Sequence, residues 1–145
     1  MTLPTFEDHH GDPKLVKEGW FETLARTIAV DFDGVLHPYS GGWQGSVPAT
    51  EDPTEGALEF LEWCKKNDYR VVVYSTRANH AEGLQGIADW LNTHKFSEYI
   101  ADITHEKPPA VAYVDDRAVP FTGSWISVYA NIQHLVRQDH RGAAK

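Results

Sequence analysis

Four aspartates in two closely spaced pairs are the strongest candidates for chemistry in this sequence. Asp31 and Asp33 follow one short apolar run, and Asp115 and Asp116 follow another further along the chain. Carboxylates this close repel one another unless a positive group lies between or beside them. Mg²⁺ is a hard cation that carboxylate and phosphate oxygens can coordinate together. The two pairs therefore predict a magnesium site. The alternative interpretation is that each pair is an acidic turn exposed to solvent.

A hydroxyl group and several cations accompany these acids. Ser75 and Thr76 follow a third apolar run, Arg77 comes next, and Lys107 stands shortly before the second aspartate pair. A hydroxyl and one or two cations are what a dianionic phosphoryl group needs for orientation and charge balance. We therefore expect a phosphate-binding site, although an ordinary surface residue is the default interpretation for Lys107 taken alone.

Weaker candidates lie close to these motifs. His37 and His80 follow the first two apolar runs closely enough to line a pocket. Tyr39 and Trp43 belong to a glycine-rich stretch at residues 37–50, which is either a mobile flap over a site or a plain surface connection. The sequence has no Gly-Lys-Ser/Thr motif, so we do not expect it to bind ATP as a P-loop kinase does.

Short runs rich in β-branched and aromatic residues predict the strands that position these residues. The runs are more continuous than alternating, which is typical of strands buried on both faces. We predict strands at residues 27–32, 70–75, 110–114 and 125–130, and a less regular one at residues 99–104.

Helical patterns separate the strands. One helix is predicted to open at Asp52 and to continue through Cys64, a second opens at Asn79, and residues 131–138 form a short last helix. This alternation predicts an α/β fold of the three-layer, Rossmann-like kind, with a parallel sheet and helices on both of its faces. Ligands of such sheets bind beyond the carboxyl ends of the strands, where the candidate residues stand.

The length of 145 residues fits one domain. We assign residues 1–26 to an N-terminal extension, residues 27–138 to the core and residues 139–145 to a C-terminal tail. With 41% hydrophobic residues, the chain can build a hydrophobic core without disulfides or structural metal ions. This composition excludes intrinsic disorder.

Charge and cysteine content narrow the class of protein further. Thirteen basic and 21 acidic residues give a net charge of −8, which disfavours long contacts with a nucleic-acid backbone. A single cysteine, Cys64, excludes an internal disulfide and a cysteine-based zinc site. No apolar run is long enough for a signal peptide or a membrane span. We expect a cytoplasmic protein without membrane contacts.

The motifs, taken in order, resemble those of the haloacid dehalogenase (HAD) superfamily of phosphohydrolases. The resemblance spans residues 27–117. Its motifs are an apolar strand with Asp-x-Asp-Gly-x-Leu at residues 31–36, a strand followed by Ser75, then Lys107, and a strand followed by Asp115-Asp116.

The resemblance implies a chemical role for each acid. Asp31 would attack phosphorus and form an aspartyl-phosphate, which divides one hard hydrolysis into two easier steps. Asp33 would protonate the leaving oxygen and then deprotonate water. Mg²⁺ would be held by the Asp31 carboxylate, the backbone carbonyl of Asp33 and Asp116, with Asp115 acting through water.

The resemblance also implies how a substrate binds. Ser75 and Lys107 would hold the phosphoryl oxygens, and whether Thr76 shares the role of Ser75 is left open. Arg77 or Arg117 would bind the rest of the substrate. These two arginines make their motifs similar to those of the phosphatase domain of phage polynucleotide kinases, which suggests a nucleotide or a polynucleotide 3′-phosphate as substrate.

No sizeable cap domain fits between the motifs. Only 41 residues separate Asp33 from Ser75, and 31 separate Ser75 from Lys107. Because a cap selects the substrate in many HAD proteins, the sequence leaves open which small phosphorylated compound or nucleic-acid end is hydrolysed. The alternatives are a non-catalytic phosphate-binding protein and a phospho-acceptor signalling domain, although in the latter the lysine follows the accepting aspartate, whereas Lys107 precedes Asp115.

Overall fold

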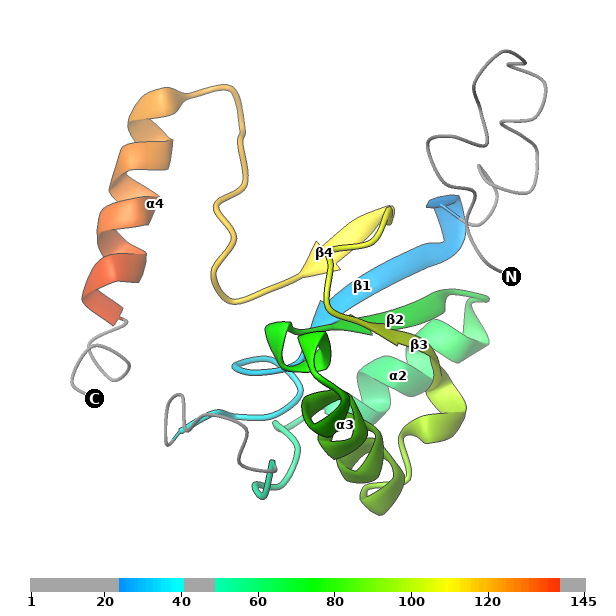
Figure 1. Cartoon of the computed structure of the whole chain (residues 1–145). Helices are drawn as coiled ribbons and strands as arrows, with labels where there is room; N and C mark the ends of the chain where they lie inside the picture. Colours follow the sequence, from blue (N-terminus) through cyan, green and yellow to red (C-terminus); the bar gives the residue numbers. More distant parts are fainter. Residues whose placement is uncertain (1–23, 41–48, 139–145) are drawn as a thin grey trace, which may run out of the picture.

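A computed structural model of the chain describes residues 24–40 and 49–138, and its centre is a parallel sheet (Figure 1). The four strands lie in the order β3-β2-β1-β4. Every neighbouring pair is parallel, so all strands present their carboxyl ends at the same edge. The strands are β1 at Thr27–Asp31, β2 at Arg70–Tyr74, β3 at Ile100–Thr104 and β4 at Ala112–Val114.

Helices connect β1 to β2 and β2 to β3, as parallel pairing requires, whereas residues 105–111 lead from β3 to β4 without a helix. The α-helices whose bounds lie within the described residues are α2 at Ala57–Lys66, α3 at Ala81–Thr93 and α4 at Trp125–Gln138, and residues 24–26 are also helical. Two short 3₁₀ turns complete the described elements, η3 at Thr76–Asn79 and η4 at Ser97–Tyr99. This order confirms the predicted α/β class with a parallel sheet.

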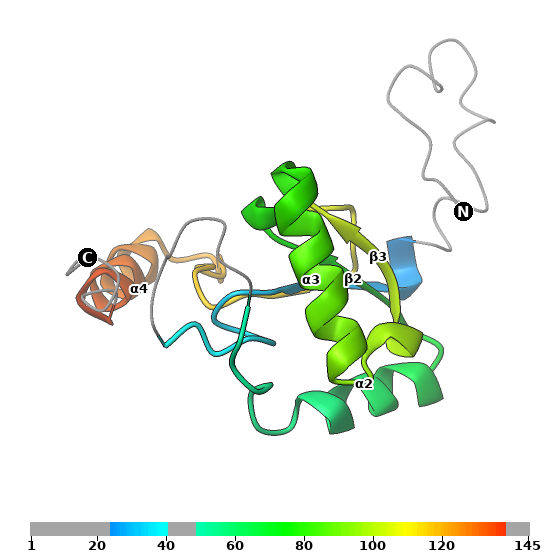
Figure 2. The same cartoon turned by 60° about the horizontal axis from the view of Figure 1, so that its bottom comes forward.

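The core lies between one face of the sheet and helices α2 and α3 (Figure 2). Alternate strand residues such as Val30 and Val73 pack against Leu61 of α2 and Leu91 of α3. The connections from β1 to β2 and from β2 to β3 both move across the sheet in the same direction. Because such connections are right-handed, they place α2 and α3 on the same face of the sheet. The predicted helices on both faces are therefore seen on one face only in the described part of the chain.

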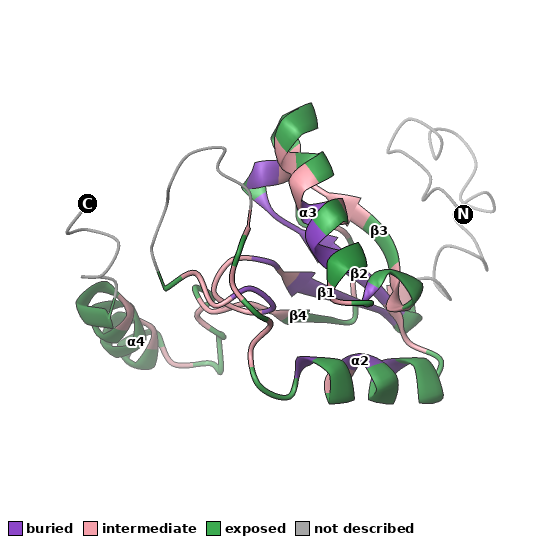
Figure 3. Cartoon of the chain, turned by 90° about the horizontal axis from the view of Figure 1, so that it is seen from below, coloured by how far each residue is buried: buried purple, intermediate pink, exposed green. Residues whose placement is uncertain are grey.

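The predicted burial of the strands on both faces holds for the central pair alone. β1 and β2 are almost wholly buried, whereas β4 and the middle of β3 are exposed (Figure 3). The second face carries Ala29, Val72 and Tyr113 at neighbouring positions. An edge strand has one neighbour only, so a continuous apolar run does not guarantee burial there.

The prediction of a strand at residues 125–130 is wrong, because these residues form the first half of α4. Its apolar residues Trp125, Tyr129, Ile132 and Val136 recur at helical spacing, a period that continues through the predicted short helix at residues 131–138. All four are exposed, and α4 stands apart from the sheet in Figure 1.

The predicted helix start at Asp52 is also wrong, since α2 begins at Ala57. The backbone nitrogen of Thr54 donates to the carbonyl of Leu36 at 3.0 Å, and its hydroxyl donates to the carbonyl of Val35 at 2.6 Å. These bonds hold the segment against the turn that follows β1, so the favourable capping sequence is overruled by tertiary contacts.

Some predictions lie outside the described residues. These are the N-terminal extension up to residue 23, most of the glycine-rich stretch including Trp43, and the tail at residues 139–145. Among the helices that the structure does describe, none is long and apolar enough to cross a membrane.

Candidate functional site

The carboxyl ends of β1, β2 and β4 bring the predicted motifs together. β1 lies between the other two strands. Asp31 is its last residue, Ser75 directly follows β2, and Asp115 directly follows β4. The strand order therefore places three motifs that are far apart in the sequence at one edge of the sheet, as the sequence predicts.

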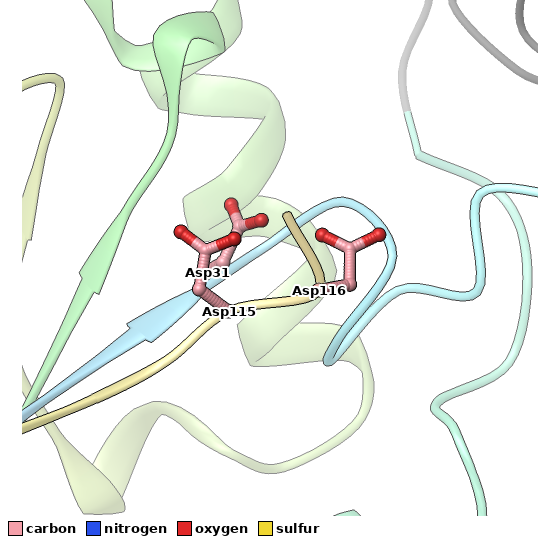
Figure 4. A group of neighbouring side chains, drawn as sticks. All are labelled: Asp31, Asp115 and Asp116. Atoms are coloured by element: carbon pink, nitrogen blue, oxygen red, sulfur yellow. The ribbon is translucent and has the colours of Figure 1, made fainter. Parts of the chain in front are cut away.

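Asp31, Asp115 and Asp116, which we call the acid cluster, form the centre of this edge (Figure 4). One carboxylate oxygen from each lies within 4.8 Å of the others. Carboxylate oxygens are the ligands that hard divalent cations prefer. The cluster could therefore hold a metal ion.

The acid cluster strongly perturbs the titration of Asp31. Burial, together with the charges of Asp115 and Asp116, raises the pKa of Asp31 from 3.8 to about 8. The backbone N–H of Phe32 donates to its Oδ1 at 2.8 Å but does not offset these effects. A cation at this position would relieve the repulsion, so the donor set and its charge fit a hard metal cation.

Gly34 allows the two acidic motifs to approach each other closely. Its φ angle is +86°, in the left-handed region that favours glycine. A Cβ atom at this position would overlap the Oδ2 and Cγ atoms of Asp116. The glycine of the first motif thus lets the turn after β1 pass against the aspartate of the last.

Asp33 points to different partners from those of Asp31. Nε of Arg77 donates to its Oδ2 at 2.6 Å, and Nη2 of Arg77 donates to its Oδ1 at 3.0 Å. Nδ1 of His37 lies 3.1 Å from the same Oδ1. Burial alone would raise the pKa of Asp33, but the hydrogen bonds of His37 and Arg77 and the arginine charge outweigh it and hold this pKa below its ordinary value.

His37 is the centre of a second layer behind Asp33. Only 5% of the residue is exposed, and its ring stacks on Phe32 and meets the edge of Trp90. Nε2 of His37 lies 3.7 Å from Oε2 of Glu51, and the indole N–H of Trp90 donates to the Glu51 carbonyl at 2.8 Å. Helix α3 and the segment before α2 thereby support the turn that carries Asp33.

The turn after β2 supplies the candidate hydroxyls. Ser75 is buried, and its Oγ accepts a 3.2 Å hydrogen bond from the backbone N–H of Arg77. Thr76 is exposed. The buried hydroxyl of Ser75 caps the η3 turn, and that turn presents the Arg77 side chain to Asp33.

Asp115 has partners at both carboxylate oxygens. Oδ1 accepts from the backbone N–H of the exposed Arg117 at 2.7 Å. Oδ2 accepts from the hydroxyl of Tyr74 at 2.5 Å and lies 4.0 Å from Nζ of Lys107. Burial and the Asp115 carboxylate raise the pKa of Tyr74, so its hydroxyl stays protonated as a donor.

The structure thus unites most of the predicted residues but divides them between two groups. Lys107 joins the acid cluster through Asp115, whereas the Asp33 carboxylate belongs with Arg77. Sequence reasoning missed Tyr74 and Tyr113. Their only sequence signal is position, since Tyr74 directly precedes the Ser75 motif and Tyr113 stands two residues before Asp115.

Comparison of the sequence with models of known protein families and with curated proteins gives no match, and a search of the solved structures gives none either. The chain can therefore be described as an α/β protein with a parallel sheet and an acid cluster at its carboxyl edge. The resemblance to the HAD superfamily rests on the four sequence motifs.

Proposed function

We propose that this protein is a magnesium-dependent phosphatase of the capless HAD type that hydrolyses a phosphomonoester through an aspartyl-phosphate. One observation carries the proposal: the acid cluster, Ser75 and Lys107 stand at the same edge of a parallel sheet, beyond the ends of three adjacent strands. This combination provides cation ligands, a hydroxyl and an ammonium group for one phosphoryl group.

Asp31, Asp115 and Asp116 are the residues that would hold Mg²⁺, together with the backbone carbonyl of Asp33. When bound there, Mg²⁺ would offset the repulsion between the carboxylates, keep Asp31 ionised and withdraw charge from the phosphoryl oxygens. Both oxygens of Asp115 already accept hydrogen bonds from the protein, which favours a contact through water for this residue.

Asp31 is the proposed nucleophile. A carboxylate oxygen of Asp31 attacks phosphorus, the phosphorus–oxygen bond to the leaving group breaks, and the leaving oxygen takes a proton from Asp33. Water then attacks the phosphorus of the aspartyl-phosphate, the bond from phosphorus to the Asp31 oxygen breaks, Asp33 accepts the proton of that water, and inorganic phosphate is released. Asp31 ends β1 and Asp33 lies in the turn that follows it, and we propose that both act on one substrate.

Asp33 needs a proton before it can act as an acid, and its contact with Arg77 opposes protonation. We propose that Arg77 therefore fixes the orientation of the Asp33 carboxylate in the resting protein, in addition to the predicted role in substrate binding. Asp33 would act most readily on good leaving groups or after Arg77 turns toward a substrate anion. Arg117, which is exposed beside Asp115, is the second cation for that purpose.

The proposed substrate is a phosphomonoester, because the chemistry requires one. Arg77 and Arg117 follow the motifs in the same way as in the phosphatase domain of phage polynucleotide kinases, so we propose a nucleotide or a polynucleotide 3′-phosphate. The net charge of −8 favours a short substrate, because long contacts with a phosphate backbone need a basic surface.

A phosphatase screen with Mg²⁺ tests the proposal. It should cover nucleotides, sugar phosphates and 3′- or 5′-phosphorylated oligonucleotides. We expect turnover that EDTA abolishes and that Asp31→Asn lowers by about a thousandfold or more. Asp68→Asn is the matched control, since Asp68 lies at a turn away from the site with a φ angle of +60° that asparagine accommodates.

Each outcome of this screen has a meaning. Full activity in Asp31→Asn would contradict the covalent mechanism. Binding of Mg²⁺ and inorganic phosphate without turnover of any phosphomonoester would contradict the proposed enzyme and favour a phosphate-binding protein.

A further inference from the structure

Two tyrosines flank the side chain of Lys107. Nζ of Lys107 lies 4.8 Å from the ring centroid of Tyr113 and 5.7 Å from that of Tyr74. Ammonium groups within about 6 Å of an aromatic ring centroid are attracted by the ring quadrupole. The two rings are 6.5 Å apart and nearly perpendicular, so the lysine meets one ring from β2 and one from β4. We call this pair of tyrosines the lysine cradle.

The hydroxyls of the lysine cradle are also occupied. Tyr74 donates to Oδ2 of Asp115 at 2.5 Å, and Tyr113 donates to the carbonyl of Pro108 at 2.6 Å. Pro108 directly follows the lysine in the chain. Tyr113 therefore contacts both the ammonium group and the backbone of the loop that carries Lys107.

Burial does not fix Lys107 by itself. Its side chain is 49% exposed, and the loop from residue 105 to 111 has no regular secondary structure. A lysine side chain with four rotatable bonds would sample many positions on such a loop. The ring contacts and the distance of 4.0 Å to Asp115 restrict the ammonium group to the edge of the acid cluster.

The backbone explains why the tyrosines meet. Both project from the sheet face that α2 and α3 do not cover, and β1 runs between their strands. β1 contributes Ala29 to that face, paired with Tyr113 in the register. A small residue at this position leaves room for the two rings to approach each other above the strand.

We propose that Tyr74 and Tyr113 are positioning residues for two different parts of the site, the phosphate-binding lysine and the metal-binding aspartate. The two rings hold the Lys107 ammonium group where it can bind a dianionic phosphoryl group, and the Tyr74 hydroxyl holds Asp115 in the orientation that the metal subsite needs. This inference rests on the proposed phosphatase function for its role in catalysis. The division of metal and phosphate binding can be tested without turnover.

The test uses two binding measurements on four variants. Calorimetry gives the affinity of the metal-free protein for Mg²⁺, and then the affinity of the magnesium-loaded protein for inorganic phosphate. Tyr74→Phe removes a hydroxyl but keeps a ring, whereas Tyr113→Leu removes a ring but leaves Asp115 its two hydrogen-bond donors, the Tyr74 hydroxyl and the Arg117 backbone N–H. Tyr113→Phe is the conservative rescue. Tyr99→Leu is the matched control, because Tyr99 has a similar ring contact to Lys65, at 5.4 Å, away from the site.

The proposal predicts a crossed result. Tyr74→Phe should weaken Mg²⁺ binding about tenfold, since residues that orient metal ligands typically contribute that much, and should change phosphate binding by less than about threefold. Tyr113→Leu should weaken phosphate binding about fivefold to tenfold, in line with one cation–π contact, and leave Mg²⁺ binding within about twofold. Tyr113→Phe should restore most of the phosphate affinity, and Tyr99→Leu should alter neither.

A spectroscopic measurement guards against misfolded variants. Aromatic rings shift the NMR signals of the Lys107 methylene groups next to Nζ to higher field, and this shift should shrink in Tyr113→Leu, which keeps only the Tyr74 ring, but persist in Tyr113→Phe. Equal loss of both affinities in every variant, or an unshifted Lys107 signal in the unaltered protein, would overturn the proposal. If no phosphomonoester is hydrolysed while the crossed result is obtained, the proposed function fails and the lysine cradle stands.

Discussion

Asp31 and Asp33 are two residues apart, yet their surroundings drive their titration in opposite directions. Asp31 faces two further carboxylates, and burial together with these charges raises its pKa to about 8. Asp33 is also partly buried, but His37 and Arg77 hold its pKa below the ordinary value. The same residue type thus fits a cation-binding role in one position and a charge-paired role in the other.

Asp31→Asn should stabilise the metal-free protein while abolishing its activity. Removing one of three crowded carboxylates relieves repulsion, so we expect an increase of about 1 kcal/mol in the free energy of unfolding at neutral pH. Denaturant titration in EDTA measures it. In Mg²⁺ the gain should vanish, because the variant also lacks a proposed metal ligand. A metal-free variant less stable than the unaltered protein would contradict the repulsion described here.

Asp33→Asn should have the opposite effect on stability. The variant removes the carboxylate charge that pairs with the buried Arg77 guanidinium, and we expect a loss of about 1–2 kcal/mol, moderated because asparagine still accepts one hydrogen bond. Turnover should fall because the variant lacks the proposed proton donor, and the phosphoenzyme should accumulate with an activated leaving group such as p-nitrophenol. Rapid breakdown of the phosphoenzyme in this variant would remove Asp33 from the acid and base role.

At the scale of elements, helix α3 supports the site through a close backbone contact with the η3 turn. A Cβ atom at Gly83 in the first turn of α3 would overlap the backbone carbonyl of Arg77 in η3. Backbone atoms cannot yield as a flexible side chain can. The position of the helix therefore fixes the turn that presents Arg77 to Asp33.

Gly83→Ala should displace η3 and weaken the pair between Arg77 and Asp33. We expect a loss of about 1–3 kcal/mol in the free energy of unfolding, the usual cost of overpacking, together with reduced turnover. Gly86→Ala is the control in the same helix, since a Cβ there meets no atom within 4 Å, and it should stabilise by about 0.5–1 kcal/mol. Thermal and denaturant unfolding measure both, and equal effects of the two variants would refute the contact.

For the whole molecule, the acid cluster should make stability depend on pH and on metal together. The Asp31 pKa is about 8 in the folded protein against an ordinary value of 3.8. The folded state therefore binds more protons than the unfolded state between these values, and its stability falls as the pH rises. The lowered pKa of Asp33 has the opposite effect on stability. The ionised Asp33 stabilises the folded protein, and this contribution is lost as the pH falls.

We expect the melting temperature of the metal-free protein to decline between about pH 5 and 8. Saturating Mg²⁺ should remove much of this decline, since ligand at about 100 times its dissociation constant adds about 2.7 kcal/mol. Asp31→Asn should flatten the metal-free profile, which separates this group from the eight histidines. Differential scanning calorimetry across this range, with EDTA or Mg²⁺, checks the prediction, and identical profiles would contradict it.

The sequence by itself determined the α/β class, the two central strands and the positions of the acidic motifs. Continuous β-branched runs define buried strands, and parallel strands must end at one edge. Asp31, Ser75 and Asp115 could therefore be assigned to one edge without coordinates. Gly34 was already part of the first motif, but its contact with Asp116 became visible only in the structure.

Only the tertiary structure decided which partners each of these residues has. The pairing of Asp33 with Arg77, the contact of Tyr74 with Asp115 and the contact of Lys107 with the Tyr74 ring join residues 33 or more positions apart. Tertiary contacts also moved the start of α2, and the helical stripe of residues 125–138 overruled the expected strand. Local sequence patterns determine the spacing of apolar residues and the residues found at turns. The partners of a side chain depend instead on the order of the strands and on where small residues leave room between larger side chains.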